Sequence, residues 1–363
     1  MIFLLLDRMS LHTIIGVMSG TSMDGLDVCL STFESHEGQG YSFDIQHAHT
    51  FKYDINLLDR LSKAKKLPSE ELFDLDKKLG LFFADSINQF IEKFKVDKSK
   101  VDAIASHGHT IFHQPNRGFT VQIGCGDTIA SRTGIQVIND FRQKDVIAGG
   151  QGAPLVPIGD HLLFGNQADA FLNIGGFANI SIPSEKTIAF DISPGNLPLN
   201  SIAQEFGRDF DEGGIVARSG KIDNTILEKL NNLSFYNRKP PKSLGTEWLE
   251  HEFIPILNEI KSPENRMRTC VSHLACQIDR VCKEFNIGKL YLTGGGVYNT
   301  FLLEEIKSFG STELILPTVE IIEFKEALIF GFLGALYLDG KTNVLSSVTG
   351  ASKDVTGGVL HLP

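Results

Sequence analysis

The stretch GVMSGTSMDGLD, at residues 16–27, connects two short apolar runs, 14–18 and 26–30, through a polar turn. Apolar runs of this length that stop at glycine are typical of β-strands separated by a tight turn. Gly20 and Gly25 lie in that turn, and glycine allows the backbone to approach a ligand closely and to adopt positive φ. The segment is therefore predicted to be strand, glycine turn, strand.

The other residues of this turn are those that a phosphate-binding loop uses. Thr21 and Ser22 supply hydroxyl donors, and successive backbone N–H groups in such a turn form an anion nest. Asp24 and Asp27 add carboxylates that could hold Mg²⁺, directly or through water. A polar hairpin turn has a similar composition, so this stretch alone leaves both interpretations open.

Two further glycine turns follow strand-like runs, one in LNIGGFANIS at 172–181 and one in LTGGGVYN at 292–299. Three such turns favour nucleotide binding over chance. Other nucleotide-binding motifs are missing, because there is no G-x-x-x-x-G-K-[ST] loop and no protein-kinase signature. Gly124 and Gly126 do not form a dinucleotide fingerprint, since Ile129 occupies the position of its third small residue.

Helical and strand periodicities alternate along the chain, which predicts the α/β class. Apolar residues at helical spacing predict a helix at 69–94, with Ser69 as its N-cap, and others at 267–285 and 326–337. The strand–turn–strand pattern occurs in both halves, which indicates an internally duplicated fold. Strands are predicted near 14–18, 26–30, 101–106, 119–123, 168–174, 180–182, 187–192 and 289–292.

The composition is that of a globular protein of 363 residues, with 42% apolar and 21% charged residues. The net charge of −10 argues against binding to a nucleic-acid backbone. Five cysteines without metal-ligand spacing suggest reduced thiols. The apolar run at 2–6 is too short for a signal peptide or a membrane span, so we expect a cytoplasmic protein that does not bind membranes.

Seven motifs follow one another along the chain. They are GVMSGTSMDGLD (16–27), SHGHTIFHQP (106–115), DFRQKDVIAGGQGAPLVP (140–157), LNIGGFANIS (172–181), KSLGTEW (242–248), LTGGGVYN (292–299) and KEAL (325–328). This ordered set resembles that of the anhydro-N-acetylmuramic acid kinases. The resemblance implies the actin, Hsp70 and hexokinase type of fold, which is ribonuclease H-like, with two domains. We expect residues 12–131 with 335–363 to form the N-terminal domain and 132–334 the C-terminal domain, after a short extension at 1–11.

The resemblance also implies an activity, with ATP, Mg²⁺ and an amino sugar as ligands. Members of the family cleave the 1,6-anhydro bond of the sugar with water and phosphorylate O6, which gives N-acetylmuramic acid 6-phosphate. Asp191 matches the general base that activates the water, a role that suits a positioned carboxylate. Glu326 matches a carboxylate near the sugar hydroxyls, and a homodimer is expected by analogy with the family.

The resemblance assigns the remaining ligand contacts to residues of both halves. The turns that contain Gly175 and Gly294 are expected to contact ATP, and His107, Arg142 and Asn196 the sugar. Asp24 is the expected Mg²⁺ ligand. The complete set of expected nucleotide contacts is Gly20, Thr21, Ser22, Met23, Asp24, Gly25, Leu26, Asp27, Gly175, Gly176, Gly294, Gly295 and Gly296.

The sequence departs from the family pattern beside the expected base. The family reads Asp-Thr-Gly-Pro-Gly-Asn with a second aspartate four residues later, whereas this chain has Ile192, Ser193 and Asn200 at the corresponding positions. A hydroxyl and a carboxylate are therefore lost next to Asp191. Two alternatives follow, a non-catalytic or regulatory binding protein on the same scaffold and a kinase for a different amino sugar.

Other polar clusters allow two readings each. His107, His109 and His113 have spacing that a metal site could use, but we expect them to line a ligand cleft. The DFRQKD segment at 140–145 is read either as a substrate clamp or as a group of surface ion pairs. Trp248 either borders a sugar or packs in the core.

Overall fold

The computed structural model describes residues 10–20, 23–36 and 40–363, and the chain divides into two compact units. Unit 1 comprises 1–163 with 324–363, and unit 2 comprises 164–323. The predicted domain bounds lie elsewhere, at 131/132 and 334/335. The structure groups 137–139 with unit 1 because this strand pairs with the strand at 103–114 in the same sheet.

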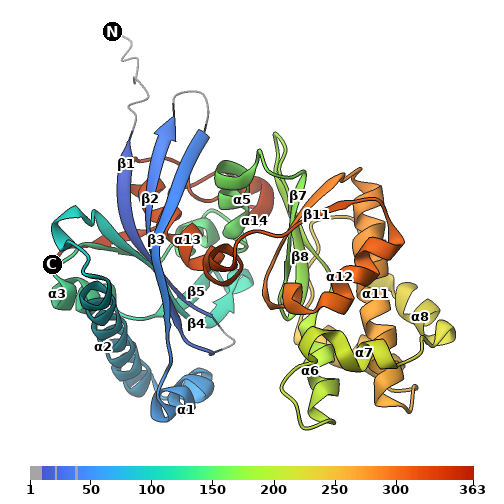
Figure 1. The fold of residues 1–363 in the computed structure, drawn as a ribbon. Helices are drawn as coiled ribbons and strands as arrows, with labels where there is room; N and C mark the ends of the chain where they lie inside the picture. The colour runs from blue at the N-terminus through green and yellow to red at the C-terminus, as the bar shows by residue number, and fades with distance from the viewer. Residues whose placement is uncertain (1–9, 21–22, 37–39) are drawn as a thin grey trace. The chain divides into compact units, whose positions relative to one another are not determined.

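The sheet of unit 1 contains an antiparallel meander followed by parallel strands. The order is β12-β6-β4-β1-β2-β3, with β5 paired to β4 (Figure 1). β1 pairs antiparallel with β2 and parallel with β4, and β4 pairs parallel with β6. Its strands are β1 Leu11–Ser19, β2 Leu26–His36, β3 Gly40–Phe51, β4 Ala103–Gln114, β5 Phe119–Ile123, β6 Val137–Asn139 and β12 Val359–His361.

Unit 2 repeats this arrangement in its own sheet. The order is β11-β10-β7-β8-β9, in which β7, β8 and β9 form an antiparallel meander and β10 and β11 run parallel to β7. The strands are β7 Ala170–Ile174, β8 Phe177–Ile182, β9 Ile188–Pro194, β10 Lys289–Thr293 and β11 Glu313–Ile315. Numbered within its unit, the sheet of unit 2 has the strand order 3-2-1-4-5, and that of unit 1 has the order 3-2-1-4-6-7, with its fifth strand paired to the fourth outside this path. This is the duplicated ribonuclease H-like topology of actin-like proteins, and it confirms the predicted fold class.

Helices complete both units (Figure 1). Unit 1 contains α1 Ile55–Lys63, α2 Ser69–Phe94, α3 Gly126–Thr133, α4 Gln143–Ile147, most of α5 Val156–Phe164, most of α13 Val319–Leu338, and α14 Ser346–Thr349. Unit 2 contains α6 Asn196–Gln204, α7 Ile215–Ser219, α8 Asn224–Asn231, α9 Thr246–Trp248, α10 Ile254–Leu257, α11 Pro263–Glu284 and α12 Thr300–Phe309. None of the helices in the described residues is long and apolar enough to span a bilayer.

Apolar stripes on the helices cover the sheets, as their periodicity predicts. In unit 1, α2 buries Leu79, Phe83 and Phe90 against the core. Burying side chains of this size contributes about 1.5–3 kcal/mol each. The predicted helix at 69–94 is confirmed, but Ser69 is wrong as its N-cap, because Ser69 is already helical and Pro68 precedes it.

Helix α13 is apolar on nearly all sides, and within unit 1 it packs tightly against β1. A Cβ atom at Gly16 would lie 1.9 Å from the backbone oxygen of Ala327 and 2.8 Å from the nitrogen of Gly331. Glycine is thus required at residue 16 for the helix to approach the strand. This contact places Glu326, one residue before Ala327, close to the strand that leads into the first glycine turn.

Candidate functional site

The first glycine turn joins β1 to β2 in unit 1. Thr21 and Ser22, two of the predicted contacts, lie outside the described residues. Met23 has a positive φ of 58°, and its N–H donates to the carbonyl of Gly20. A Cβ atom at Gly25 would lie 2.6 Å from the Thr50 side chain, so the chain passes close to β3 as Leu26 begins β2.

The polar residues of this turn are connected to neighbouring elements. The Thr50 hydroxyl donates to Asp27 Oδ1 at 2.6 Å, which fixes that carboxylate. Just before the turn, Ser19 accepts a hydrogen bond from the Tyr53 hydroxyl at 2.6 Å and lies 2.8 Å from Nδ1 of His109. Burial lowers the pKa of His109, so its imidazole is neutral. These buried contacts support the end of β1 from which the turn emerges.

Arg142 and His107 form a joined pair in unit 1. The guanidinium of Arg142 donates from Nε at 3.1 Å and from NH2 at 2.9 Å to Nε2 of His107, and from NH1 at 2.8 Å to the carbonyl of Gly152. Burial and the adjacent guanidinium hold the pKa of His107 well below its usual range. A neutral imidazole that accepts at Nε2 carries its proton on Nδ1.

Glu326 and Arg142 influence one another electrostatically. Burial lowers the pKa of Arg142 to about 10, and Glu326 opposes that shift. The pKa of Glu326 is raised by desolvation and, to a smaller extent, by Asp24, while Arg142 and Lys325 lower it. The Glu326 side chain nevertheless remains accessible to solvent. Unit 1 therefore brings Asp24, His107, Arg142 and Glu326, all singled out from the sequence, into one polar region.

A buried ion pair anchors the helix that carries Glu326. Nζ of Lys325 lies 2.6 Å from Oδ1 of Asp160 on α5, and both side chains are almost fully buried. Removing one partner of such a pair would leave an uncompensated charge, a change that typically costs about 3–5 kcal/mol. This pair fixes α13 one residue from the Glu326 carboxylate.

Taken as a whole, the DFRQKD segment forms neither the substrate clamp nor the group of surface ion pairs predicted for it. Arg142 contacts His107 as described, Lys144 donates to the carbonyl of Thr356, and the Asp145 side chain is fully buried. A set of surface ion pairs is therefore wrong for this segment, and Arg142 is the member that fits a substrate clamp. The nearby His113 lies 3.4 Å from the Thr120 hydroxyl. Among the described residues, no group of three side chains has the arrangement of a metal site.

In unit 2 the second and third glycine turns lie together at one end of the sheet. The turn at Gly175 and Gly176 ends β7, and a 3₁₀ turn at Gly295–Tyr298 follows β10. A Cβ atom at Gly294 would lie 2.5 Å from Oδ1 of Asn173 and 2.8 Å from the carbonyl of Ile174. Asn173 and Ile174 end β7, so the backbones of the two turns lie too close together to leave room for a side chain at residue 294.

Helix α6 begins at the same place and completes this cluster. The N–H of Asn196 donates to the carbonyl of Gly175 at 2.8 Å, and its side-chain amide donates to the carbonyl of Ile174 at 3.2 Å. The nearest atom to a Cβ at Gly295 would be Nδ2 of Asn196, at 3.9 Å, so the space at residue 295 is open. Unit 2 thus places Gly175, Gly176 and the Gly294–Gly296 turn, which are expected nucleotide contacts, next to Asn196, an expected sugar contact.

Asp191 lies on β9, where one of its oxygens is held by the backbone. Oδ2 accepts the N–H of Leu244 at 2.7 Å, and the Asp191 N–H donates to the carbonyl of Lys242 at 3.0 Å. Desolvation raises the pKa of the Asp191 carboxyl, and the Leu244 N–H opposes this. A half-buried carboxylate of raised basicity, with one oxygen fixed, suits a general base.

The residues that depart from the family pattern follow Asp191 directly. The register passes from Asn179↔Asp191 to Ala178↔Ser193, so Ile192 is an extra residue on β9 that forms a β-bulge. Bulges re-aim neighbouring side chains and occur next to active sites. Ile192 and Ser193 are both buried, and Asn200 is half-buried on α6. The altered positions are thus internal packing positions around a retained carboxylate.

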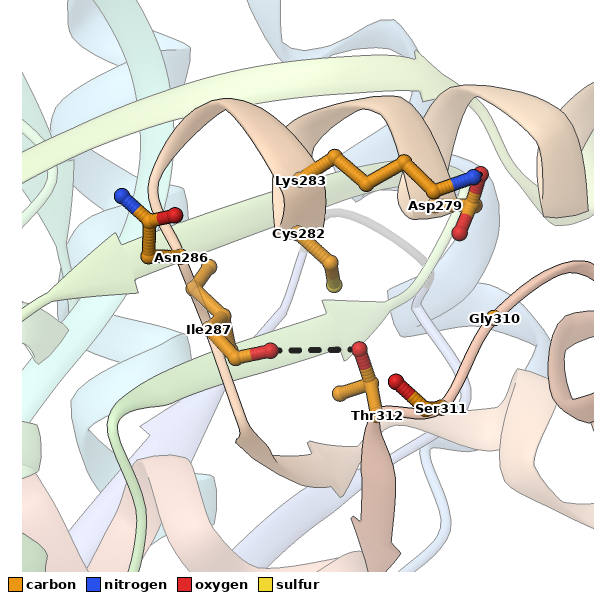
Figure 2. A pocket seen from close by; sticks show the side chains of 8 residues that line it. All are labelled: Asp279, Cys282, Lys283, Asn286, Ile287, Gly310, Ser311 and Thr312. Carbon is orange, nitrogen blue, oxygen red and sulfur yellow. Dashed lines mark hydrogen bonds and ion pairs between the residues drawn. The ribbon is translucent and has the colours of Figure 1, made fainter.

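Two other features of unit 2 lie apart from these residues. Trp248 is half-buried against the rings of Phe235, Tyr236 and Phe253, which favours the packing interpretation. A hollow of about 240 Å³ opens beside the end of α11 (Figure 2). Its lining includes none of the predicted site residues and consists of Asp279, Cys282, Lys283, Asn286, Ile287, Gly310, Ser311 and Thr312.

Comparison with known proteins identifies relatives over almost the whole chain. A family model described as "Anhydro-N-acetylmuramic acid kinase" matches residues 12–363. An anhydro-N-acetylmuramic acid kinase of Shewanella pealeana is 36% identical over 369 residues, which cover 96% of this chain and 98% of the relative. One of Francisella tularensis subsp. novicida is 35% identical over 377 residues, which cover 96% and 98%.

The solved structures that resemble the chain do so more distantly. A ROK family glucokinase from Streptomyces griseus, solved with glucose and AMPPNP, is 10% identical with a TM-score of 0.40, covering 88% of this chain and 98% of that one. The fold assignment therefore rests on the strand order of the two sheets rather than on this likeness.

Proposed function

The chain belongs to the anhydro-N-acetylmuramic acid kinase family, and we propose that its Asp191 is the base of an ATP-dependent kinase that opens the 1,6-anhydro ring of its sugar. Water adds to C1, O6 is released from C1 and takes the γ-phosphoryl group of ATP, and the product is N-acetylmuramic acid 6-phosphate. The observation that carries this proposal is the half-buried Asp191 carboxylate, held at one oxygen by the Leu244 N–H. A kinase that consumes ATP and recycles cell-wall sugar belongs in the cytoplasm.

Asp191 accepts the proton of the attacking water. Its Oδ2 is already bonded to the Leu244 N–H, which leaves Oδ1 for the water. The raised pKa of Asp191 strengthens the carboxylate as a base. As the O–H bond of water breaks, the water oxygen bonds to C1. The C1–O6 bond breaks, and the released O6 takes the γ-phosphoryl group.

Arg142 and Glu326 recognise the sugar in unit 1. The lactyl group of a muramic acid carries a carboxylate, which suits the guanidinium of Arg142. His107 accepts from Arg142 and thereby orients the guanidinium. Glu326 is accessible and can accept hydrogen bonds from sugar hydroxyls.

The glycine turns hold ATP through backbone N–H groups. In unit 2 the clustered turns at Gly175–Gly176 and Gly294–Gly296 present backbone that no Cβ atom screens, and Asn196 adds an amide at its edge. The Gly20–Asp27 turn of unit 1 adds further donors, and backbone nests of this kind bind phosphate. These turns bind and orient the nucleotide so that the γ-phosphoryl group faces O6.

Asp24 fits a Mg²⁺ ion that accompanies the nucleotide. Carboxylate oxygen is the ligand type that Mg²⁺ prefers, and Asp24 lies on the phosphate loop. Asp27 lies within β2, whereas Asp24 lies in the turn between Gly20 and Gly25, and we therefore assign the ion to Asp24. The ion would neutralise charge on the phosphates, while Asp24 and the backbone hold it in place.

The test is ADP release from ATP and anhydro-N-acetylmuramic acid, compared between the native enzyme and Asp191→Asn. Asn keeps the size of the side chain and an oxygen for the Leu244 N–H but cannot take a proton, so we expect kcat to fall about 10²–10⁴-fold. Binding of ADP, followed by calorimetry, should remain within twofold because Asp191 does not hold the nucleotide.

Two outcomes would contradict the proposal. Full turnover by Asp191→Asn would remove the base from this residue. A native protein that binds ATP but releases no ADP with this sugar would favour the binding-protein alternative, which Ile192, Ser193 and Asn200 suggest. Turnover with another amino sugar from a panel would instead indicate a kinase of different specificity.

A further inference from the structure

The backbone of Gly152 is held on both sides of its Cα atom, by the side chain of Asp145 on α4 and by that of Arg142, the residue before this helix. Its N–H donates to Oδ2 of Asp145 at 2.7 Å, and its carbonyl accepts from NH1 of Arg142 at 2.8 Å. The same guanidinium donates to His107 through Nε and NH2. Asp145 is thereby connected to Arg142 through a single backbone unit.

The second oxygen of Asp145 is also occupied. Oδ1 accepts the hydroxyl of Thr349 on α14 at 2.7 Å, and the Gln151 N–H donates to the carbonyl of Thr349 at 2.8 Å. The Asp145 side chain has an exposed fraction of 0%. It therefore cannot touch a substrate, and its two bonds connect the 149–152 loop to the C-terminal segment.

The loop has a shape that depends on this carboxylate. A Cβ atom at Gly150 would lie 2.2 Å from Oδ2 of Asp145, so the backbone passes directly over the carboxylate. Gly152 has a φ of +69°, which favours glycine. The Gly152 carbonyl that receives Arg142 is consequently placed by Asp145 and not by local chain preference.

We propose that Asp145 is a positioning residue that aims the Arg142 guanidinium at the carboxylate of the sugar. This inference rests on the proposed function, in which Arg142 recognises that group. With its NH1 on Gly152 and its Nε and NH2 on His107, the guanidinium is fixed in two directions. Loss of the Asp145 bonds frees the Gly152 backbone, so the NH1 group of Arg142 is no longer held in place.

The role depends on hydrogen bonding rather than on the negative charge of Asp145, and this gives a conservative rescue. In Asp145→Asn the amide oxygen can accept the Gly152 N–H. The amide nitrogen can donate to Thr349, whose hydroxyl is then free to donate to the carbonyl of Leu345, 3.3 Å away. Asp145→Ala can make none of these bonds.

The experiment compares Asp145→Ala with Asp145→Asn in steady-state kinetics on the full chain. We expect Asp145→Ala to raise KM for the sugar at least about tenfold, with KM for ATP within twofold, because only the sugar-facing guanidinium is misplaced. Asp145→Asn should return KM for the sugar to within about threefold of native. Thr349→Val, a milder change, should raise the same constant by a smaller factor.

A second measurement does not depend on activity. The ¹⁵N–¹H signal of Arg142 Nε, assigned by its loss in Arg142→Lys, should be protected from water exchange in the native protein and in Asp145→Asn, and should exchange at least about tenfold faster in Asp145→Ala. Equal protection in all three would overturn the inference. So would an Asp145→Ala protein whose two KM values rise together, or do not rise.

Failure of the two proposals can be told apart. If the native protein does not turn over the sugar while Arg142 Nε loses its protection only in Asp145→Ala, the proposed substrate is wrong and the positioning of Arg142 stands. If turnover is normal and Asp145→Ala leaves KM and exchange unchanged, the positioning role is wrong. Should Asp145→Ala fail to fold, Thr349→Val decides by the same two readouts.

Discussion

The two units hold their predicted site residues in different ways. In unit 1 the site consists of side chains in contact with each other, in which Arg142 bonds to His107 and to the loop that Asp145 holds. In unit 2 it consists mostly of backbone, where Gly294 approaches Ile174 too closely for any Cβ atom. Related sheets therefore carry two kinds of site. The side-chain contacts of unit 1 are lost when a side chain is deleted, and the backbone surface of unit 2 is lost when a side chain is added.

The largest effect on this difference between the units is expected from a methyl group added at Gly294. Its φ of 83° and ψ of 162° lie in a region almost confined to glycine, and the new Cβ atom would meet Asn173 and the Ile174 carbonyl. We expect Gly294→Ala to lower the free energy of unfolding by at least about 2 kcal/mol and to abolish detectable ATP binding. Urea denaturation and calorimetry measure the two effects.

The adjacent residue provides the matched control. At Gly295 a Cβ atom would have 3.9 Å to its nearest neighbour, so Gly295→Ala should change the free energy of unfolding by less than about 0.5 kcal/mol. Its methyl group would nevertheless occupy space needed by the nucleotide, and ATP affinity should fall about tenfold. A native-like Gly294→Ala, or an unstable Gly295→Ala, would refute the distinction.

A second prediction concerns the pH dependence of turnover. Asp191 must be ionised to accept a proton, and its pKa is raised by burial, so kcat should fall as pH falls through a value above the usual carboxyl pKa of about 3.9. Below that value kcat should drop about tenfold for each pH unit. The measurement is a kcat profile from about pH 4 to about pH 8.

Glu326 in unit 1 is another carboxyl of raised pKa, and its variant tests which residue causes the fall of kcat at low pH. Glu326→Gln should lower kcat or raise KM for the sugar but keep an acid limb at the same pH, because that limb belongs to Asp191. Disappearance of the limb in Glu326→Gln would assign the proton acceptor to unit 1 and contradict the role of Asp191.

Much of the fold could be predicted because its signals are local. Helix 69–94 and strand 119–123 follow from the spacing of apolar residues, and both are confirmed at the predicted bounds. Strand β3 at Gly40–Phe51 was not predicted, because as an edge strand it alternates exposed with half-buried residues and carries polar side chains on both faces. Short α4 was not predicted either, since five residues show no helical period.

The candidate site likewise combines features that the sequence predicts with features that it does not. The glycine turns were predictable because each demand for glycine lies within a few residues of a strand end. The contacts of Asp145 were not, since Thr349 is 204 residues away in the sequence and no periodicity relates the two. The bond from the Leu244 N–H to Asp191 was equally hidden, because every residue except proline carries that donor.

The smallest effect is expected at the hollow beside α11, which is not part of either half of the site. Lys283 lies one helical turn from Asp279 (Figure 2), and its exposed ammonium pairs at 2.6 Å with the mostly buried Asp279 carboxylate. Pairs of this kind contribute about 0.3–0.5 kcal/mol, so Lys283→Met should change the free energy of unfolding by no more than that. Its kcat and both KM values should stay within about twofold of native, since no ligand is expected there. A large fall in ATP affinity in Lys283→Met would place nucleotide contacts at this hollow and would mean that the clustered glycine turns are not the main binding surface of unit 2.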